Sequence, residues 1–209
     1  MFTRSQMMVA NEQWRAATLP IDVSGAEIQR VLKSGGVGAV KGAGGSSPVL
    51  YVNLSEVQEL VKQFAEGEGE EVIVNSFVLL AEGAMVSSED PRLAKVSQII
   101  DLGGMGLNLN TAILKRVYTV FEANYPECLD KFILFPVGRF MAAAAYGLLS
   151  FVNEKTRAKF VPTDDLDIVC AELGLDRAEL GDTALHEFVK KKGEGVGDEL
   201  ESEFGLDEK

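Results

Sequence analysis

The sequence predicts an α/β protein with a mostly parallel β-sheet of about four to five strands flanked by helices. Short β-branched apolar runs alternate along the chain with segments of helical periodicity, which is the pattern of strand–helix–strand units. The chain has 209 residues, of which 46% are apolar and 25% charged. This length and composition are typical of one globular domain with a sizeable core.

The first quarter of the chain predicts helical structure followed by a loop and a strand. Residues 12–32 have a helix-like pattern that Pro20 interrupts. Gly and Ser dominate residues 34–47, which predicts a loop or a pair of turns. A strand is expected at residues 48–54, with Pro at the position where a missing N–H matters least. Ser55 begins a capping-box pattern that predicts a helix start.

The middle of the chain alternates between the two kinds of element. Residues 72–86 open with β-branched residues, but their apolar positions recur at helical spacing, so we expect a helix. A second strand is predicted at 96–102 and an amphipathic helix at 113–121. The continuous apolar run 131–137 is typical of a strand covered on both faces. The Ala-rich segment 141–152 predicts another helix.

The last part of the chain predicts a short strand near Lys159 and helical structure over residues 165–192. Gly and acidic residues dominate from Gly193 onward, which is typical of a solvated tail. We therefore expect one domain at 1–192 and an acidic, disordered tail at 193–209.

Charge excludes several classes of partner. The net charge is −12, so we expect neither nucleic-acid binding nor broad adhesion to anionic membranes. No run reaches the roughly 20 apolar residues of a membrane span, and the first residues do not resemble a secretory signal. Cys128 and Cys170 are expected to be reduced structural thiols. These features predict a cytoplasmic protein with only transient membrane contact.

Enzymatic motifs are weak. The Gly-rich run 35–42 precedes a strand and lacks the Gly-Lys-Ser/Thr of a phosphate-binding loop. The glycines at 103–106 follow a strand but have the wrong spacing, so a tight turn explains them. His186 is the single histidine, which disfavours a His-based metal centre or triad. We therefore expect that the protein is not an enzyme and binds neither a metal nor a cofactor.

A long apolar segment, residues 140–152, lies between Glu127 and Lys159. It is too short to cross a bilayer, and an acid and a base near its ends suggest an apolar pocket with a polar mouth. Taken alone, Glu127 after a helix-ending proline would be a solvated charge. Lys155, Arg157 and Lys159 would likewise be an ordinary basic patch at a helix C-terminus.

Several motifs occur together in a characteristic order. They are residues 99–105 (Ile-Ile-Asp-Leu-Gly-Gly-Met), 124–127 (Asn-Tyr-Pro-Glu), 131–134 (Lys-Phe-Ile-Leu), 151–152 (Phe-Val) and 156–160 (Thr-Arg-Ala-Lys-Phe). This order resembles the CRAL-TRIO lipid-binding domain, most closely its phosphatidylinositol-transfer branch, from about Pro48 to Val161. The N-terminal helical bundle common in that family is largely missing, apart from a remnant around Trp14. A basic headgroup residue that this bundle can supply is therefore missing as well.

The resemblance implies roles for particular residues. Glu127, Thr156 and Lys159 would bind the inositol phosphate headgroup, and pairing the acid with the lysine would lower the cost of burying either. A gating helix would close the apolar pocket. Its lining residues would be Phe140, Met141, Tyr146, Leu148, Leu149, Phe151 and Val152.

Three functions remain open at this point. The first is a carrier that holds a phospholipid, with phosphatidylinositol as the expected ligand, and exchanges it with membranes. The second is a carrier of a neutral apolar ligand such as a tocopherol, a retinoid or a sterol. The third is a regulatory or scaffolding module of the same fold that no longer exchanges lipid.

Overall fold

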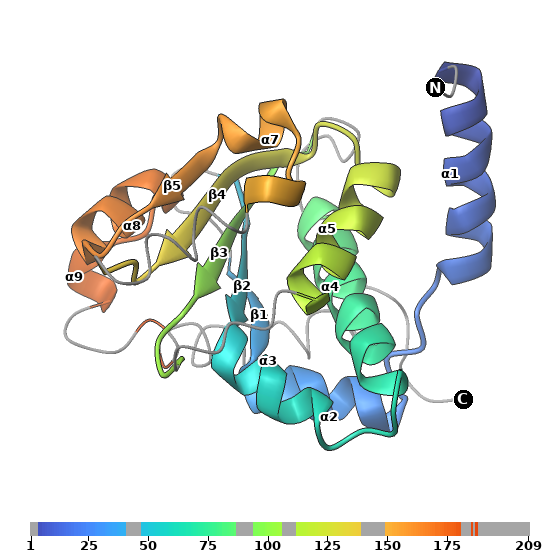
Figure 1. Ribbon diagram of the computed structural model, residues 1–209, viewed down its shortest axis with the longest axis horizontal. Coiled ribbons are helices and arrows are strands. Elements are labelled where there is room, and N and C mark those ends of the chain that lie inside the picture. The colour runs from blue at the N-terminus through green and yellow to red at the C-terminus, as the bar shows by residue number, and fades with distance from the viewer. Residues whose placement is uncertain are drawn as a thin grey trace.

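A computed structural model describes residues 4–40, 47–86, 94–105, 112–138 and 149–180, together with Leu185 and Glu187. A single β-sheet lies between helices on its two faces (Figure 1). The arrangement confirms the predicted α/β architecture with a mostly parallel sheet. Within the described ranges, no helix has both the length and the hydropathy needed to cross a membrane.

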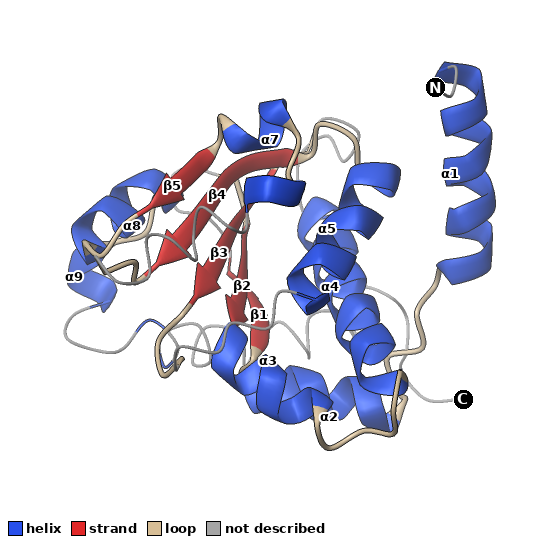
Figure 2. Cartoon of the chain, viewed as in Figure 1, coloured by secondary structure: helices blue, strands red, loops and turns tan. Residues whose placement is uncertain are grey.

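In the described ranges the sheet has five strands in the order β1-β2-β3-β4-β5, drawn in red in Figure 2. They are β1 (Val37–Val40), β2 (Val49–Asn53), β3 (Val96–Asp101), β4 (Leu129–Phe135) and β5 (Phe160–Pro162). Strands β2 to β5 run parallel, and only β1 pairs antiparallel to its neighbour. The register aligns the carboxyl ends of the central strands, since Asn53 pairs with Asp101 and Asp101 with Phe135.

Strand β1 corrects the expectation of a loop over residues 34–47. Its Val37, Ala39 and Val40 side chains are all buried, so the segment contributes to the core despite the surrounding glycines. Val37 to Val40 pair with β2 in antiparallel register, which needs only a short connection. Composition alone did not reveal this strand because Gly38 interrupts its apolar pattern.

One face of the sheet carries the larger helical layer, which lies to the right of and below the sheet in Figure 1. Its helices are α1 (Arg4–Thr18), α2 (Ala26–Ser34), α3 (Leu54–Val61), α4 (Glu68–Val86) and α5 (Ala112–Asn124). Buried side chains of α4 and α5, such as Phe77 and Val117, form one apolar cluster with Ile100 and Leu134 of the sheet. The burial of Ile73, Phe77 and Leu80 confirms the predicted helix over residues 72–86.

The opposite face is covered by α8 (Leu166–Leu173), with the short α9 (Arg177–Leu180) after it. Val169 and Leu173 of α8 pack with Tyr51, Ile99 and Ile133, all of which are fully buried. Because helices cover the central strands on both sides, the side chains that point to either face of the sheet are mostly apolar.

Helix ends follow local capping chemistry. Asn53 caps α3 by accepting a hydrogen bond from the Glu56 backbone N–H at 3.0 Å, so the helix begins before the expected start at Ser55. Asp165 caps α8 by accepting a hydrogen bond from the Asp167 backbone N–H. Other predicted features, namely residues 140–148 of the gating segment 140–152, His186 and the tail 193–209, lie outside the described residues.

A buried polar pair fixes the carboxyl end of β3. The Tyr51 hydroxyl donates to Asp101 Oδ2 at 2.5 Å, and the Gly103 backbone N–H donates to Oδ1 at 2.7 Å. A Cβ at Gly103 would lie 2.9 Å from that Oδ1 atom, so only glycine fits there without a shift. Burial and the neighbouring carboxylate raise the pKa of Tyr51, which therefore remains a donor at neutral pH.

We expect Asp101→Ala to lower the free energy of unfolding by about 2 to 3 kcal/mol, because the buried Tyr51 hydroxyl loses its acceptor. Urea unfolding followed by circular dichroism measures this effect. Asp22→Ala is the control, since that carboxylate is exposed and, among the described residues, accepts hydrogen bonds from nearby Ser24. Equal midpoints for the two variants would show that the Tyr51–Asp101 bond contributes little.

Candidate functional site

A cavity of about 290 Å³ lies between α5, the sheet and the short helix α7 (Glu154–Arg157). Its wall is largely apolar and comes from the strands, from α5 and from the segment before α7. The main apolar lining residues are Leu50, Ile100, Val117, Phe121, Phe132 and Val152. Such a concave apolar space with a few polar groups is the usual form of a small-molecule site.

The three residues predicted to bind a headgroup all line this one cavity. Glu127 lies in the connection between α5 and β4, Thr156 lies in α7, and Lys159 directly precedes β5. Thr156 and Lys159 are half-buried, whereas Glu127 is exposed. Segments that are about thirty residues apart in sequence therefore meet at one mouth.

Asn153 positions α7, and with it Thr156, at the edge of the cavity. Its side chain caps the helix by accepting from the Thr156 backbone N–H at 2.9 Å. Its own backbone N–H donates to the Tyr118 hydroxyl at 2.8 Å, and its side-chain amide donates to Glu122 at 3.0 Å. Both partners belong to α5, so α7 is fixed to the helix that forms the opposite wall.

Lys159 has an internal partner. Its ammonium group donates to the backbone carbonyl of Leu129, at the start of β4. Its backbone continues the sheet, because the Phe132 N–H donates to the Lys159 carbonyl at 3.0 Å. The side-chain bond to Leu129 and the backbone bond to Phe132 together hold the Lys159 ammonium at the cavity wall.

Glu127 pairs with a different lysine from the one expected. Its carboxylate accepts from the Lys155 ammonium at 2.6 Å, and no ion pair joins it to Lys159 among the contacts of the described residues. This ion pair lowers the pKa of Glu127 and raises that of Lys155. The sequence had placed Lys155 only in a general basic patch, which did not indicate which lysine would reach Glu127.

The backbone of Glu127 is strained. Its φ angle is +62°, in the left-handed region that residues with a Cβ rarely adopt. The Lys95 ammonium donates to the Glu127 carbonyl at 2.8 Å and holds the turn in place. Non-glycine residues in this conformation concentrate at functional sites, where the surrounding structure fixes a costly geometry.

The family model of the CRAL/TRIO domain matches residues 45–173, which include every strand from β2 to β5 and the whole cavity wall. The chain belongs to the CRAL/TRIO domain family. It is therefore a lipid-binding domain of the α/β class, as the order of motifs indicated. A crystal structure of Sfh5 matches with a TM-score of 0.67 and 18% sequence identity, over 90% of this chain and 73% of that chain.

The predicted gate of the CRAL/TRIO domain is described only at its end. Val152 is buried and lines the cavity, whereas Leu149 lines a separate shallow hollow with Arg157 and Phe160. Phe151 lies in the 3-10 helix η2 (Leu149–Phe151), and its side chain is not described. The remaining predicted gate residues lie outside the described ranges; they are Phe140, Met141, Tyr146 and Leu148.

Several lining residues of the CRAL/TRIO cavity were not predicted from sequence. Gln98 is a polar residue within an apolar strand, and that irregularity was a usable signal. Tyr118 lies at helical spacing between Leu114 and Phe121, and this spacing was a second usable signal that it shares their face of α5. Cys128 is buried in the wall, and this burial raises its thiol pKa to about 11. Such a thiol is unreactive at neutral pH.

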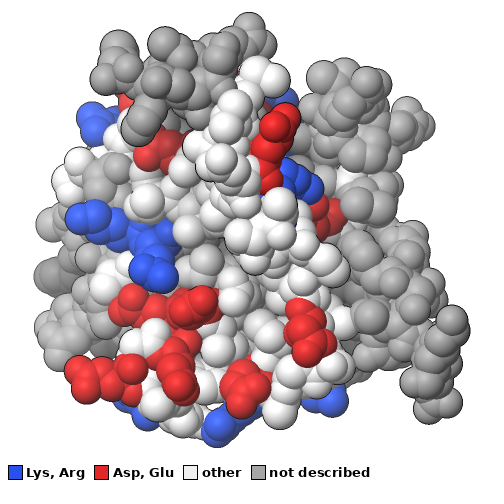
Figure 3. All heavy atoms as spheres, turned by 90° about the vertical axis from the view of Figure 1, so that its right-hand side faces the viewer, with Lys and Arg blue, Asp and Glu red and all other residues white. Residues whose placement is uncertain are grey.

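The surface outside the cavity is mixed in charge. On the face seen in Figure 3, acidic side chains gather in the lower part and basic ones form smaller groups among the described residues. In the part of the chain that the structure describes, no three His, Cys, Asp or Glu side chains gather as a metal site would require.

We expect the Glu127→Gly variant to be about 1 kcal/mol more stable than Glu127→Ala, since both remove the carboxylate but only glycine accepts the left-handed backbone without strain. Chemical denaturation of the two variants measures the difference. Their direct comparison cancels the loss of the ion pair to Lys155. Equal stabilities would mean that the turn around residue 127 relaxes freely.

Proposed function

We propose that this CRAL/TRIO domain holds a phospholipid, with phosphatidylinositol as the preferred ligand, and exchanges it with membranes. The observation that carries this proposal is the meeting of Glu127, Thr156 and Lys159 at the mouth of one apolar cavity. A lysine can donate a charge-assisted hydrogen bond to the lipid phosphate. A hydroxyl can donate another, and a carboxylate can accept from the hydroxyls of an inositol ring.

The apolar wall supplies affinity, and the mouth supplies selectivity. At about 0.8 kcal/mol per buried CH₂ group, two acyl chains gain on the order of 20 kcal/mol relative to water. A bilayer offers the same chains nearly the same free energy, so transfer between membrane and pocket is close to neutral. The rate of exchange is then limited by opening of the protein, and headgroup contacts decide which lipid is retained.

The cavity must widen to accept such a ligand. Its volume of about 290 Å³ lies at the lower end of the range for drug-sized molecules, and a phospholipid is larger than these. Opening of the wall is therefore part of the proposed exchange cycle.

A second candidate ligand is a neutral apolar lipid, such as a tocopherol, a retinoid or a sterol. The observation that favours it is that the charges at the mouth already have protein partners: Glu127 pairs with Lys155, and Lys159 donates to the Leu129 carbonyl. A ligand without a phosphate would leave both contacts undisturbed.

We expect Lys159→Ala to weaken phosphatidylinositol binding by about tenfold or more, because one charge-assisted hydrogen bond to the phosphate is lost. Binding of a neutral lipid such as tocopherol should change little in the same variant. Titration of the protein with vesicles that contain fluorescent phosphatidylinositol, and separately with tocopherol, measures both affinities.

Lys62→Ala is the matched control, since Lys62 is an exposed lysine with an ion pair to Glu59 and lies away from the cavity. Equal loss of both ligands in Lys159→Ala would indicate a structural lysine and contradict the headgroup role. Tight tocopherol binding together with no phosphatidylinositol binding by the wild type would favour the second candidate. Binding of neither ligand would favour a regulatory module that does not exchange lipid.

A further inference from the structure

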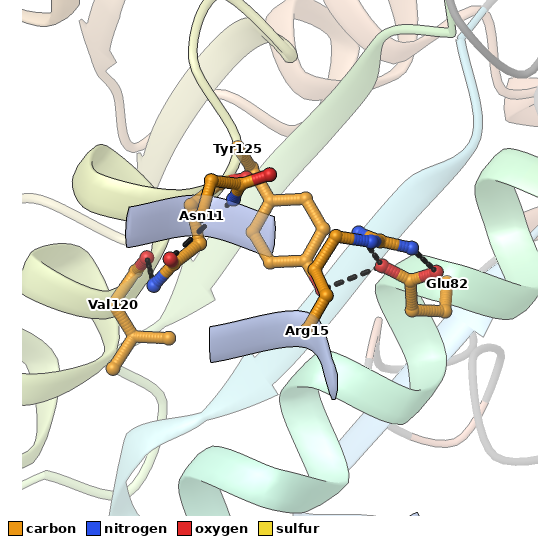
Figure 4. Close-up of polar contacts among 6 residues, drawn as sticks. Asn11, Arg15, Glu82, Val120 and Tyr125 are labelled. Carbon is orange, nitrogen blue, oxygen red and sulfur yellow. Dashed lines mark hydrogen bonds and ion pairs between the residues drawn. The ribbon is translucent and has the colours of Figure 1, made fainter. Parts of the chain in front are cut away.

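We propose that the N-terminal helix α1 positions the mouth of the lipid pocket, through a polar relay from Arg15 to Glu82 to Tyr125. In this relay Arg15 and Glu82 are positioning residues, and docking of α1 restrains the exchange of lipid. The inference rests on the proposed function, since it assigns a control on the same pocket. The relay joins α1, α4 and the residue that follows α5, as Figure 4 shows.

The relay begins with a bidentate ion pair between α1 and α4. Arg15 donates from Nη1 to Glu82 Oε1 at 2.8 Å and from Nη2 to Oε2 at 2.9 Å. Two parallel bonds of this kind fix the relative orientation of the two side chains more closely than a single contact does. The Glu82 side chain is only 17% exposed, so water competes weakly for its oxygens.

The same carboxylate continues to the pocket wall. The Tyr125 hydroxyl donates to Glu82 Oε1 at 2.6 Å, so this oxygen is shared between α1 and Tyr125. Tyr125 is buried and lines the lipid cavity, two residues before Glu127. Burial and the neighbouring Glu82 carboxylate raise the pKa of Tyr125, and its hydroxyl therefore remains a donor over the physiological range.

Two further contacts bring α1 to the same place. The Trp14 ring meets the Tyr125 ring edge-to-face, with centroids 5.8 Å apart. The Asn11 side-chain amide donates to the backbone carbonyl of Asn124 at 2.8 Å and so satisfies a free carbonyl at the end of α5. All of these contacts converge on residues 124 and 125, directly before the strained turn at Glu127.

Among residues 8–18 of α1, whose side chains are described, the contacts come from the second half of the helix. Asn11, Trp14 and Arg15 are partly buried, whereas Met8 and Val9, which precede them, are 58% and 52% exposed. Apart from the relay and the Asn11 bond, little of α1 contributes to the main core. Release of α1 would therefore remove the Trp14, Asn11 and Arg15 contacts that restrain Tyr125 and Glu82, and so loosen the mouth without removing the sheet or its main helical layer.

We expect Arg15→Ala to raise the rate of lipid transfer between vesicles by about fivefold, at the low end of couplings between distinct sites. The reason is that Tyr125 and the mouth lose their restraint. Arg15→Lys should give a rate between those of Arg15→Ala and the wild type, because an ammonium group can make one of the two bonds to Glu82. The assay follows fluorescent phosphatidylinositol moving from donor to acceptor vesicles of phosphatidylcholine.

Trp14 reports whether α1 is docked, since it is the single tryptophan of the chain and contacts Tyr125. Its emission should shift to longer wavelength in Arg15→Ala as the ring enters water. Arg177→Ala is the matched control, because Arg177 pairs with Asp167 at 2.9 Å and has a similar exposure, on the opposite side of the sheet. This control should change neither the emission nor the transfer rate.

Glu82→Gln provides a second variant in case Arg15→Ala fails to fold, as it keeps an acceptor for Tyr125 but removes the charge that holds Arg15. A mutant cycle of Arg15→Ala with Tyr125→Phe tests the relay itself, and non-additive effects on the transfer rate are expected.

An unchanged rate in a variant with red-shifted Trp14 emission, measured while the wild type transfers lipid, would overturn this inference alone. Absence of transfer by the wild type would overturn the proposed function and the relay with it.

Discussion

The connection between α5 and β4 is the constraint on which the site depends. The chain must leave a helix after Asn124 and enter a buried parallel strand at Leu129, so four residues reverse its direction. The turn is closed by a left-handed Glu127 and by the Lys95 ammonium on its carbonyl. This short path places Tyr125 in the cavity wall and the Glu127 carboxylate at the mouth. A longer connection would leave both side chains without a fixed position.

The charged groups at the mouth are satisfied before any ligand arrives. Glu127 pairs with Lys155, and Lys159 donates to a backbone carbonyl at the start of β4. A headgroup that binds there must replace these contacts, and only a group with strong acceptors, such as a phosphate, can compensate for the lost bond to Lys159. Under the proposed headgroup role, selectivity would depend on exchanging these partners for the ligand rather than on a vacant charge.

Much of the architecture could be predicted from the sequence because strands and helices of the core keep their characteristic periods. The strands at β2 to β5 and the helix α4 followed directly from apolar patterning. Strand β1 did not, since glycine hides its pattern and pairing with β2 decides its conformation. The motifs indicated Glu127, Thr156 and Lys159, but the choice of Lys155 as the partner of Glu127 is set by the tertiary arrangement of α7 against α5. The sharing of one Glu82 oxygen by Arg15 and Tyr125 could not be predicted from the sequence either, because it joins segments that are far apart in the chain.

The proposed occupant of the cavity between α5 and the sheet is a phospholipid. Mass spectrometry of lipids extracted from the purified wild-type protein, beside Lys159→Ala prepared identically, tests it most directly. We expect near-stoichiometric phosphatidylinositol in the wild type and strong depletion of this lipid in the variant. A neutral lipid in both proteins, or no lipid in either, would contradict it.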